Sequence, residues 1–181
     1  QRHITNLIKL YPNYQYAVLS RSKIKKKNII NFVSLKEAIK YQPFLTFICS
    51  PANTHVKYAE IFLKINSHLF IEKPVATNFV ELRKLFQIIK NKKKTIISGY
   101  NLRYDDSLNF FKNKIKKGIL GKILSVRSEV GQYLPNWRKK HYSKTVSAQK
   151  KLGGGVINEL SHDVDILYML FDDIKMIFGL N

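Results

Sequence analysis

A carboxylate, an amine and a proline follow one another directly after a short apolar run. The run covers residues 68–71 and has the character of a buried strand, and Glu72, Lys73 and Pro74 come next. Proline stops the strand because it lacks an N–H, and its fixed φ sets how the lysine leaves the strand. Ligands of open α/β sheets bind beyond the carboxyl ends of the strands, so Lys73 is a candidate to act on a bound molecule. A solvated lysine at a strand end is the alternative interpretation.

A second group of reactive side chains follows three glycines, residues 153–155. The next residues predict one helix whose apolar positions recur at spacings of three and four and form a single stripe for the core. The stripe comprises Ile157, Leu160, Val164, Leu167 and Phe171. On the opposite side lie Asn158, Glu159, His162 and Asp165, with His162 four residues after Asn158 and three before Asp165, so their side chains can meet. A histidine in this setting is either an acid–base group or a partly buried structural residue.

Strands and helices alternate through the first half of the chain, with short loops between them. Strands are predicted over residues 16–19, 29–33, 44–49, 68–71 and 95–99, and helices over residues 1–10, 34–41, 52–64 and 78–89. Ser34 with Glu37, and Asn78 with Glu81, are the helix-starting pairs of a capping box. This alternation predicts an α/β fold with a doubly wound parallel sheet and right-handed crossovers.

The rhythm changes at about residue 104. A helix over residues 104–117 is expected to stop at Gly118, and a longer strand over residues 123–130 presents one apolar face, formed by Leu124, Val126 and Val130. Residues 132–152 are polar and irregular, which is typical of a long surface loop that could serve as a substrate lid. A last strand is predicted over residues 174–178. These elements indicate a second, α+β domain.

The composition is that of a globular protein with a strong basic bias. The 181 residues are 45% hydrophobic and 12% aromatic, which suffices for a packed core. A net charge of +20, from 32 basic and 12 acidic residues, suggests a nucleic-acid partner. The lysines, however, form short clusters at residues 25–27, 92–94 and 116–117, between predicted elements and away from stacking aromatics. We therefore expect solvated loops and no nucleic acid.

Cysteine usage and hydropathy bound the environment of the protein. Cys49 is the only cysteine, lies in an apolar run and is expected to be buried as a small hydrophobic residue in a reducing cytoplasm. No apolar stretch approaches the roughly 20 residues that span a bilayer, and the first residues resemble no signal or transit peptide. We expect a soluble protein without a membrane partner, and we predict no metal site.

Four motifs in order resemble the Gfo/Idh/MocA oxidoreductase family, named for glucose-fructose oxidoreductase, inositol dehydrogenase and a rhizopine catabolism protein. They are Glu72-Lys73-Pro74, the turn Ser50-Pro51-Ala52-Asn53-Thr54-His55, the segment Gly99-Tyr100-Asn101-Leu102-Arg103-Tyr104, and the three glycines at 153–155. The resemblance covers nearly the whole chain. It implies a Rossmann domain that binds NAD or NADP, and a C-terminal domain whose open, largely antiparallel sheet shapes a pocket for sugars, inositols or related polyols. It further implies hydride transfer and a homo-oligomer formed through the C-terminal sheet.

One departure from the family is an absence. The Gly-x-Gly-x-x-Gly loop, whose backbone amides hold the cofactor pyrophosphate at a helix N-terminus, does not occur in the sequence. Residues 1–4 resemble the segment that follows this loop in the family. We therefore expect residues 1–103 to be a Rossmann domain without its first strand and Gly-rich loop, and residues 104–181 to be a partial substrate-binding domain. The parent enzyme is expected to be roughly twice as long.

The resemblance assigns roles to the first motif. Hydride transfer from a hydroxyl carbon needs a group that takes the hydroxyl proton and donors that stabilise alkoxide character. Lys73 suits either task, and Glu72 is expected to orient the loop that carries it.

His162 is the second acid–base candidate, with Asn158, Glu159 or Asp165 as the group that orients its ring. Many family members have Asp at the position of Glu159 and a histidine four positions beyond it. In this sequence His162 lies three positions beyond Glu159, which is a departure from the family pattern.

Further residues fall where the family lines its cleft. An arginine between small hydroxyls, in Ser20-Arg21-Ser22, suits a 2′-phosphate, so NADP is expected to be tolerated or preferred over NAD. The expected cofactor-binding set is Ser20, Arg21, Ser50, Pro51, Asn53, His55, Glu72, Lys73 and Asn101. The expected substrate-binding set is Lys73, Arg103, Asn158, Glu159 and His162, although Arg103 could equally cap the helix that follows it.

Two other classes of function stay open. A non-catalytic Rossmann-type protein that binds a nucleotide or nucleotide sugar would have little reason to keep Lys73 together with His162. A basic nucleic-acid-binding module would be retained on DNA, and this retention would fall steeply as the salt concentration rises. The main prediction is an NAD(P)-dependent dehydrogenase acting on a CH–OH group of a sugar, sugar derivative or polyol.

Overall fold

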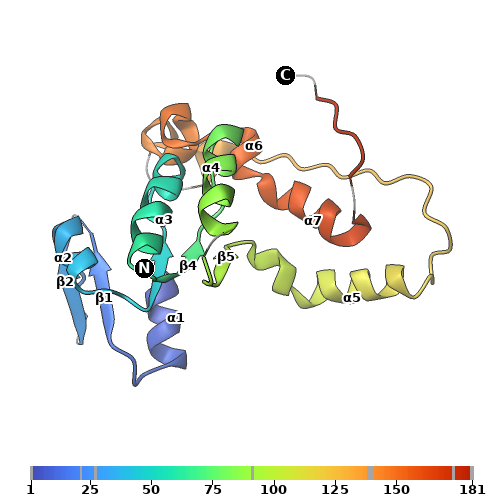
Figure 1. The fold of residues 1–181 in the computed structure, drawn as a ribbon. Coiled ribbons are helices and arrows are strands. Elements are labelled where there is room, and N and C mark those ends of the chain that lie inside the picture. The colour runs from blue at the N-terminus through green and yellow to red at the C-terminus, as the bar shows by residue number, and fades with distance from the viewer. Residues whose placement is uncertain are drawn as a thin grey trace.

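The computed structural model describes residues 2–20, 22–26, 28–90, 92–137, 141–172 and 174–179. Figure 1 shows its helices and strands, which follow the chain as α1 (Arg2–Leu10), β1 (Tyr16–Leu19), β2 (Ile29–Phe32), α2 (Leu35–Lys40), β3 (Leu45–Ile48), α3 (His55–Lys64), β4 (His68–Ile71), α4 (Phe79–Lys90), β5 (Ile96–Ser98), α5 (Asp106–Lys116), α6 (Val156–Glu159) and α7 (Ser161–Phe171).

The strands form two parallel sheets. β1 pairs with β2, and β3, β4 and β5 pair in that order, which confirms the predicted α/β fold with parallel strands. The prediction of one doubly wound sheet did not include a division into two, yet no pairing joins β1–β2 to β3–β5 in the part of the chain that the structure describes. The doubly wound order places a further strand between two such groups, and none of the described strands pairs with both.

The main core lies between α3, α4 and the three-stranded sheet. Leu69 and Ile71 of β4 are fully buried, as are Ala59 and Leu63 on one face of α3, and Leu85 of α4 closes the cluster. Each of the larger side chains contributes on the order of 1.5–3 kcal/mol by leaving water. This packing holds the carboxyl ends of β3 and β4, and hence the residues that follow them, in fixed positions.

Both predicted capping pairs are present. The Ser34 hydroxyl accepts a hydrogen bond from the Glu37 amide at 3.2 Å, and the Asn78 side chain accepts one from the Glu81 amide at 2.9 Å. The Glu37 carboxylate accepts a hydrogen bond from the Val33 amide, whereas a capping box predicts a bond from the amide of the next residue, Ser34. These contacts start α2 and α4 where the sequence indicated.

Two predicted strands are not formed. Residues 123–130 and 174–178 have no strand pairing in the described structure, and Figure 1 shows residues 119–133 as a wide loop away from both sheets. Alternating apolar residues favour an extended backbone, but a strand forms only where a second strand supplies hydrogen bonds. Without one, Leu124 is 85% exposed. The second domain therefore shows helices without the expected sheet.

The helix predicted after the three glycines is broken in two. The backbone leaves helical geometry at Leu160 (φ −97°, ψ 20°), which ends α6, and α7 begins at the next residue. The apolar stripe assumed one uninterrupted helix. In the structure Ile157 and Val164 are exposed, and Met169 and Leu170, which are not in the stripe, are buried.

The segment predicted as an irregular loop folds into short 3₁₀ turns. Three of them cover Tyr142–Lys144, Val146–Ala148 and Lys150–Leu152. The last one docks on the Rossmann half, where the Asn53 side chain donates to the Lys151 carbonyl at 2.9 Å. A Cβ on Gly154 would lie 2.1 Å from the Val146 carbonyl oxygen, so only glycine permits this close approach. The part of the loop at Arg138–Lys140 lies outside the described residues.

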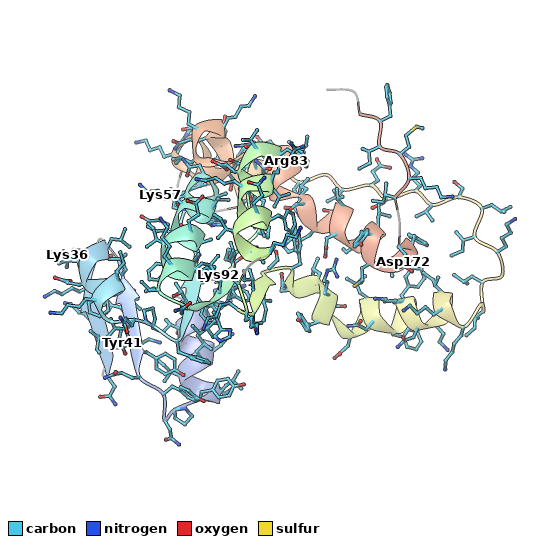
Figure 2. The ribbon with its side chains drawn as sticks, viewed as in Figure 1. Lys36, Tyr41, Lys57, Arg83, Lys92 and Asp172 are labelled. Atoms are coloured by element: carbon cyan, nitrogen blue, oxygen red, sulfur yellow. The ribbon has the colours of Figure 1, made fainter. Side chains whose placement is uncertain are left out.

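Basic side chains project from separate elements. Figure 2 shows Lys36 on α2, Lys57 on α3 and Arg83 on α4 at separate places on the ribbon, and all three residues are exposed. None of the described helices is long and apolar enough to cross a membrane.

Candidate active site

The candidate site begins where the strands of the larger sheet end. The Glu72 amide donates to the Ile48 carbonyl at 3.0 Å, and the Gly99 amide donates to the Ile71 carbonyl at 2.8 Å, so the pairing continues to the first residues after β4 and β5. A Cβ on Gly99 would lie 2.9 Å from a Glu72 carboxylate oxygen. Glycine at this position therefore lets the Glu72 carboxylate lie against the end of β5.

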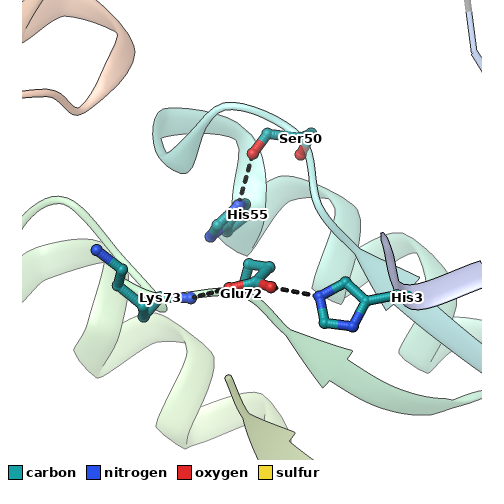
Figure 3. Close-up of polar contacts among 5 residues, drawn as sticks. All are labelled: His3, Ser50, His55, Glu72 and Lys73. Atoms are coloured by element: carbon teal, nitrogen blue, oxygen red, sulfur yellow. Dashed lines mark hydrogen bonds and ion pairs between the residues drawn. The ribbon is translucent and has the colours of Figure 1, made fainter. Parts of the chain in front are cut away.

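The Glu72 carboxylate is held from two sides. Its Oε1 lies 2.5 Å from His3 Nε2, and its Oε2 accepts a hydrogen bond from the Lys73 amide at 3.2 Å (Figure 3). The contact with the Lys73 amide is consistent with the predicted loop-orienting role. His3 was not singled out from the sequence, because nothing in its spacing shows that α1 crosses the ends of β3 and β4.

Lys73 joins the two halves of the chain. Its ammonium donates to the Glu159 carbonyl at 2.7 Å and lies 4.0 Å from the Glu159 carboxylate, and both side chains are largely covered. The Glu159 carbonyl is available because α6 ends there, which leaves it without a partner in the helix. The break at Leu160 thus has a direct consequence: it brings the backbone of α6 onto the lysine.

His162 lies in the same region, at the start of α7. Its ring stands edge-on to Tyr100, with centroids 5.6 Å apart and planes at 88°. Burial lowers the pKa of His162 from its ordinary value, and the Lys73 ammonium lowers it further, whereas the carboxylates of Asp165, Asp163 and Glu72 oppose the shift. The ring is therefore neutral at neutral pH.

The expected orienting partners of His162 do not contact it by a hydrogen bond. Its Nδ1 is buried and has no hydrogen-bond partner among the described residues, and the same holds for the Ser161 hydroxyl beside it. The Asn158 side chain donates to the Gly153 carbonyl at 3.1 Å instead. The break at Leu160 separates Asn158 from His162, whereas Asp165 lies in the same helix as His162 but is bound to Arg103. Nδ1 of the neutral ring is therefore an unsatisfied buried polar atom among the described residues.

Arg103 is committed to Asp165. Its guanidinium makes three hydrogen bonds to the Asp165 carboxylate, at 2.7, 2.8 and 3.1 Å, and the bonded carboxylate raises the pKa of Arg103. Such a fork binds firmly because its two planes match. Arg103 therefore ties the end of the Rossmann half to α7, rather than standing free for a substrate.

Several residues of the expected cofactor set hold the loops together. Both ring nitrogens of His55, which is buried, lie 2.8 Å from backbone carbonyl oxygens, those of Pro74 and Ser50. Figure 3 shows the contact with Ser50. The Ser50 hydroxyl lies 2.7 Å from that of Thr54, and the Asn53 amide is bound to the Lys151 carbonyl. His55 thus fixes the turn after β3 to the loop after β4 and does not face a ligand.

The remaining members of that set are placed differently. Ser20 follows β1, and its hydroxyl accepts from the Ser22 amide at 3.3 Å. Pro51 and Asn101 are exposed, beyond β3 and β5 respectively. Arg21 lies outside the described residues, so its orientation toward a 2′-phosphate is not part of the structure.

A pocket of about 370 Å³ opens beside His162. Its lining is mainly apolar and aromatic, with one carboxylate and one serine: Tyr100, Ile157, Ser161, Val164, Asp165, Tyr168 and Ile174. Tyr100 contacts both the pocket and the His162 ring. Tyr100 belongs to the motif at residues 99–104, but no spacing argument indicated that it would face α7.

Two family models match the chain. Residues 2–100 match the model described as an oxidoreductase family with an NAD-binding Rossmann fold, and residues 110–180 match the Gfo/Idh/MocA C-terminal domain.

The individual relatives share limited sequence identity with the chain and are longer than it. The uncharacterized oxidoreductase YhhX of Escherichia coli is 31% identical over 50% of this chain and 26% of its own length. Myo-inositol 2-dehydrogenase of Thermotoga maritima is 23% identical over 73% of this chain and 37% of its own length. The chain therefore spans between about a quarter and two fifths of these relatives.

The fold also matches solved structures. An oxidoreductase from Bacillus cereus superimposes with a TM-score of 0.74 at 19% identity, over 94% of this chain and 50% of the other. That likeness shows the fold, and the models matched over residues 2–100 and 110–180 show the family. The chain belongs to the Gfo/Idh/MocA family of oxidoreductases.

Proposed function

We propose that the chain carries the reactive site of an NAD(P)-dependent dehydrogenase that acts on a CH–OH group of a polyol, sugar or sugar derivative. One observation carries the proposal: Lys73 at the edge of the Rossmann sheet and His162 on α7 are brought into one region. The Lys73 ammonium lies on the α6 carbonyl of Glu159 and affects the charge state of His162. The family and the relatives named inositol dehydrogenases support this class of reaction.

The two side chains suit complementary tasks. A neutral imidazole with an unpartnered nitrogen can accept the proton of a substrate hydroxyl, and His162 is neutral above its ordinary pKa. An ammonium that is already placed in a covered site stabilises alkoxide character with little reorganisation. We therefore assign proton acceptance to His162 and alkoxide stabilisation to Lys73, and we regard Tyr100 as a wall that orients the imidazole.

The proposed cofactor is a nicotinamide dinucleotide, which when bound supplies the hydride acceptor. The described residues fit its ribose and nicotinamide ends, because polar groups gather at the carboxyl ends of β1, β3, β4 and β5. Those groups are Ser20, Ser50, Glu72, Lys73 and Asn101. Ser20-Arg21-Ser22 supports tolerance of NADP. His55 and Asn53 support the loops, and we no longer assign them a contact with the cofactor.

The proposed division into domains places the boundary at about residue 103. The two family models lie on either side of it, and Arg103 holds the two parts together through Asp165. In this arrangement α7 and its pocket are part of the substrate side, and the loop that carries Lys73 is part of the cofactor side.

A dehydrogenase assay on the full product of the gene tests the proposal. Inositols and hexoses are offered with NAD⁺ or NADP⁺, and reduced nicotinamide is followed by absorbance. Lys73→Met and His162→Asn are each expected to lower turnover by about two orders of magnitude or more, with cofactor affinity little changed. Lys84→Met is the matched control, since Lys84 forms an ion pair with Glu60 on the helices, away from the site.

Three results would contradict parts of the proposal. Dinucleotide binding without hydride transfer to any CH–OH compound would favour a non-catalytic binding protein. Full turnover by Lys73→Met would make that residue a solvated strand end. NAD bound at least tenfold more tightly than NADP would remove the argument from Arg21.

A further inference from the structure

Three side chains with metal-ligating atoms meet at the edge of the larger sheet. His3 comes from α1, Cys49 directly follows β3, and Glu72 directly follows β4. Their ligating atoms all lie within 4.8 Å of one another. The sequence predicted no metal site, because the three residues are far apart along the chain and follow no metal-binding spacing.

The histidine is held in place by aromatic neighbours. Its ring lies 5.7 Å from the Phe47 ring and 5.2 Å from the Phe70 ring, measured between centroids, and those two rings stack on each other at 4.8 Å. Phe47 and Phe70 are paired residues of β3 and β4, so they form a rigid support. The position of His3 Nε2 is therefore set by the sheet rather than by α1 alone.

The carboxylate is also fixed, and it has one oxygen to offer. Glu72 Oε2 accepts the Lys73 amide, whereas Oε1 contacts only the histidine among the contacts described above. A cation bound through Oε1 would leave the bond to the Lys73 amide intact. The loop after β4 would then keep its geometry when a cation binds.

Cys49 completes the set and provides an entry path. The expected burial of Cys49 is wrong, because the residue is exposed to solvent. Partial burial of its thiol, with the nearby Glu72 carboxylate, still raises the pKa of Cys49 to about 11. Sulfur, imidazole nitrogen and carboxylate oxygen together form a ligand set that favours Zn²⁺ over hard cations such as Mg²⁺.

The separations between the three ligating atoms are close to those of a tetrahedral zinc site. Zn²⁺ bonds of about 2.0–2.3 Å place neighbouring ligand atoms about 3.3–3.6 Å apart. The His3–Glu72 pair, at 2.5 Å, must open by about 1 Å, and wider pairs, at no more than 4.8 Å, must close by about as much. Both changes are within the reach of side-chain rotation.

We propose that His3 Nε2, Cys49 Sγ and Glu72 Oε1 bind one Zn²⁺-type divalent cation, with a fourth position open to solvent. Binding replaces the His3–Glu72 hydrogen bond with one metal bond to each of its two atoms, so the proton leaves His3 Nε2 and the neutral ring keeps its proton on Nδ1. The Cys49 thiol proton passes to solvent as the metal–sulfur bond forms. The proposal does not depend on the dehydrogenase function.

Cobalt titration of the full product of the gene, freed of metal by a chelator, tests the site. A Co²⁺–thiolate charge-transfer band should appear with one equivalent, and Zn²⁺ should remove it. Cys49→Ser should abolish the band, and His3→Gln should weaken Zn²⁺ binding by about tenfold or more in calorimetry. His141→Gln is the matched control, since His141 is exposed and bonded only locally to Ser143. Unchanged Zn²⁺ affinity in both site variants would overturn the proposal.

A second measurement needs no substitution and guards against a misfolded variant. In the unsubstituted protein, Zn²⁺ should slow the alkylation of Cys49 by iodoacetamide in proportion to site occupancy, and Mg²⁺ should not, with Cys49 followed by peptide mass spectrometry. Equal alkylation rates with and without Zn²⁺, at concentrations that saturate calorimetric binding, would show that the metal binds elsewhere.

Discussion

At the level of single residues, the charge state of His162 makes stability depend on pH. Burial and Lys73 place its folded pKa below the ordinary value of about 6.5. Between those two pKa values the unfolded chain binds more protons, so stability is complete above about pH 6.5 and is lost as pH falls toward the folded pKa. Between about pH 7 and about pH 5, the unsubstituted protein should therefore lose more unfolding free energy than the His162→Asn variant loses. Urea unfolding at the two pH values measures both losses.

A second histidine provides the comparison for this experiment. His141 is exposed, so His141→Asn should keep the pH dependence of the unsubstituted protein. If His162→Asn also kept it, the acid sensitivity would have to come from other groups.

At the level of elements, the Arg103–Asp165 fork fixes α7 to the Rossmann half. The Asp165 side chain is only 11% exposed, so Arg103→Met would leave a largely covered carboxylate without its partner. We expect a loss of unfolding free energy on the order of 1–3 kcal/mol. The unfolding free energy of Arg103→Lys should fall between those of the unsubstituted protein and Arg103→Met, because lysine keeps the charge but not the planar fork. Urea unfolding of the three proteins measures this series.

The pair of Arg127 and Glu129 is a suitable control. It has the same 2.7 Å distance, but both side chains are largely exposed. Arg127→Met should change stability by no more than about 0.5 kcal/mol. An equal effect of Arg103→Met and Arg127→Met would mean that the fork contributes nothing beyond an ordinary surface pair.

At the level of the whole molecule, exposed apolar residues dominate the second half. Leu124, Met176, Ile177 and Phe178 are each at least 79% exposed, and surfaces of this kind promote association. We expect residues 1–181 expressed alone to bind the dye ANS strongly and to aggregate or unfold without a sharp transition.

Charged substitutions separate this cause from a general failure to fold. Ile177→Lys with Phe178→Lys should lower ANS fluorescence while the helical signal in far-ultraviolet circular dichroism persists. A sharp, cooperative thermal transition without ANS binding would contradict the expectation.

The sequence by itself determined the elements of the first half and their class. Apolar runs and capping pairs such as Ser34–Glu37 located the helices and strands to within a few residues, because these signals are local. The alternation of elements was enough to predict parallel strands, and residue type and motif were enough to propose Glu72, Lys73 and His162 as site residues. The family resemblance, carried by the same motifs, was confirmed over most of the chain.

Only the tertiary structure decided how these residues are used. The break at Leu160 frees the Glu159 carbonyl, which accepts a hydrogen bond from Lys73, a residue distant in sequence, so helical periodicity could not reveal this contact. Residues 123–130 have the alternation of a strand, yet a strand also needs a partner that its own sequence does not contain. The commitment of Arg103 to Asp165, the buried ring of His55 and the meeting of His3 with Cys49 and Glu72 are likewise long-range. Local patterns predict elements because backbone preferences are local, whereas the partners of a side chain are set by how those elements pack.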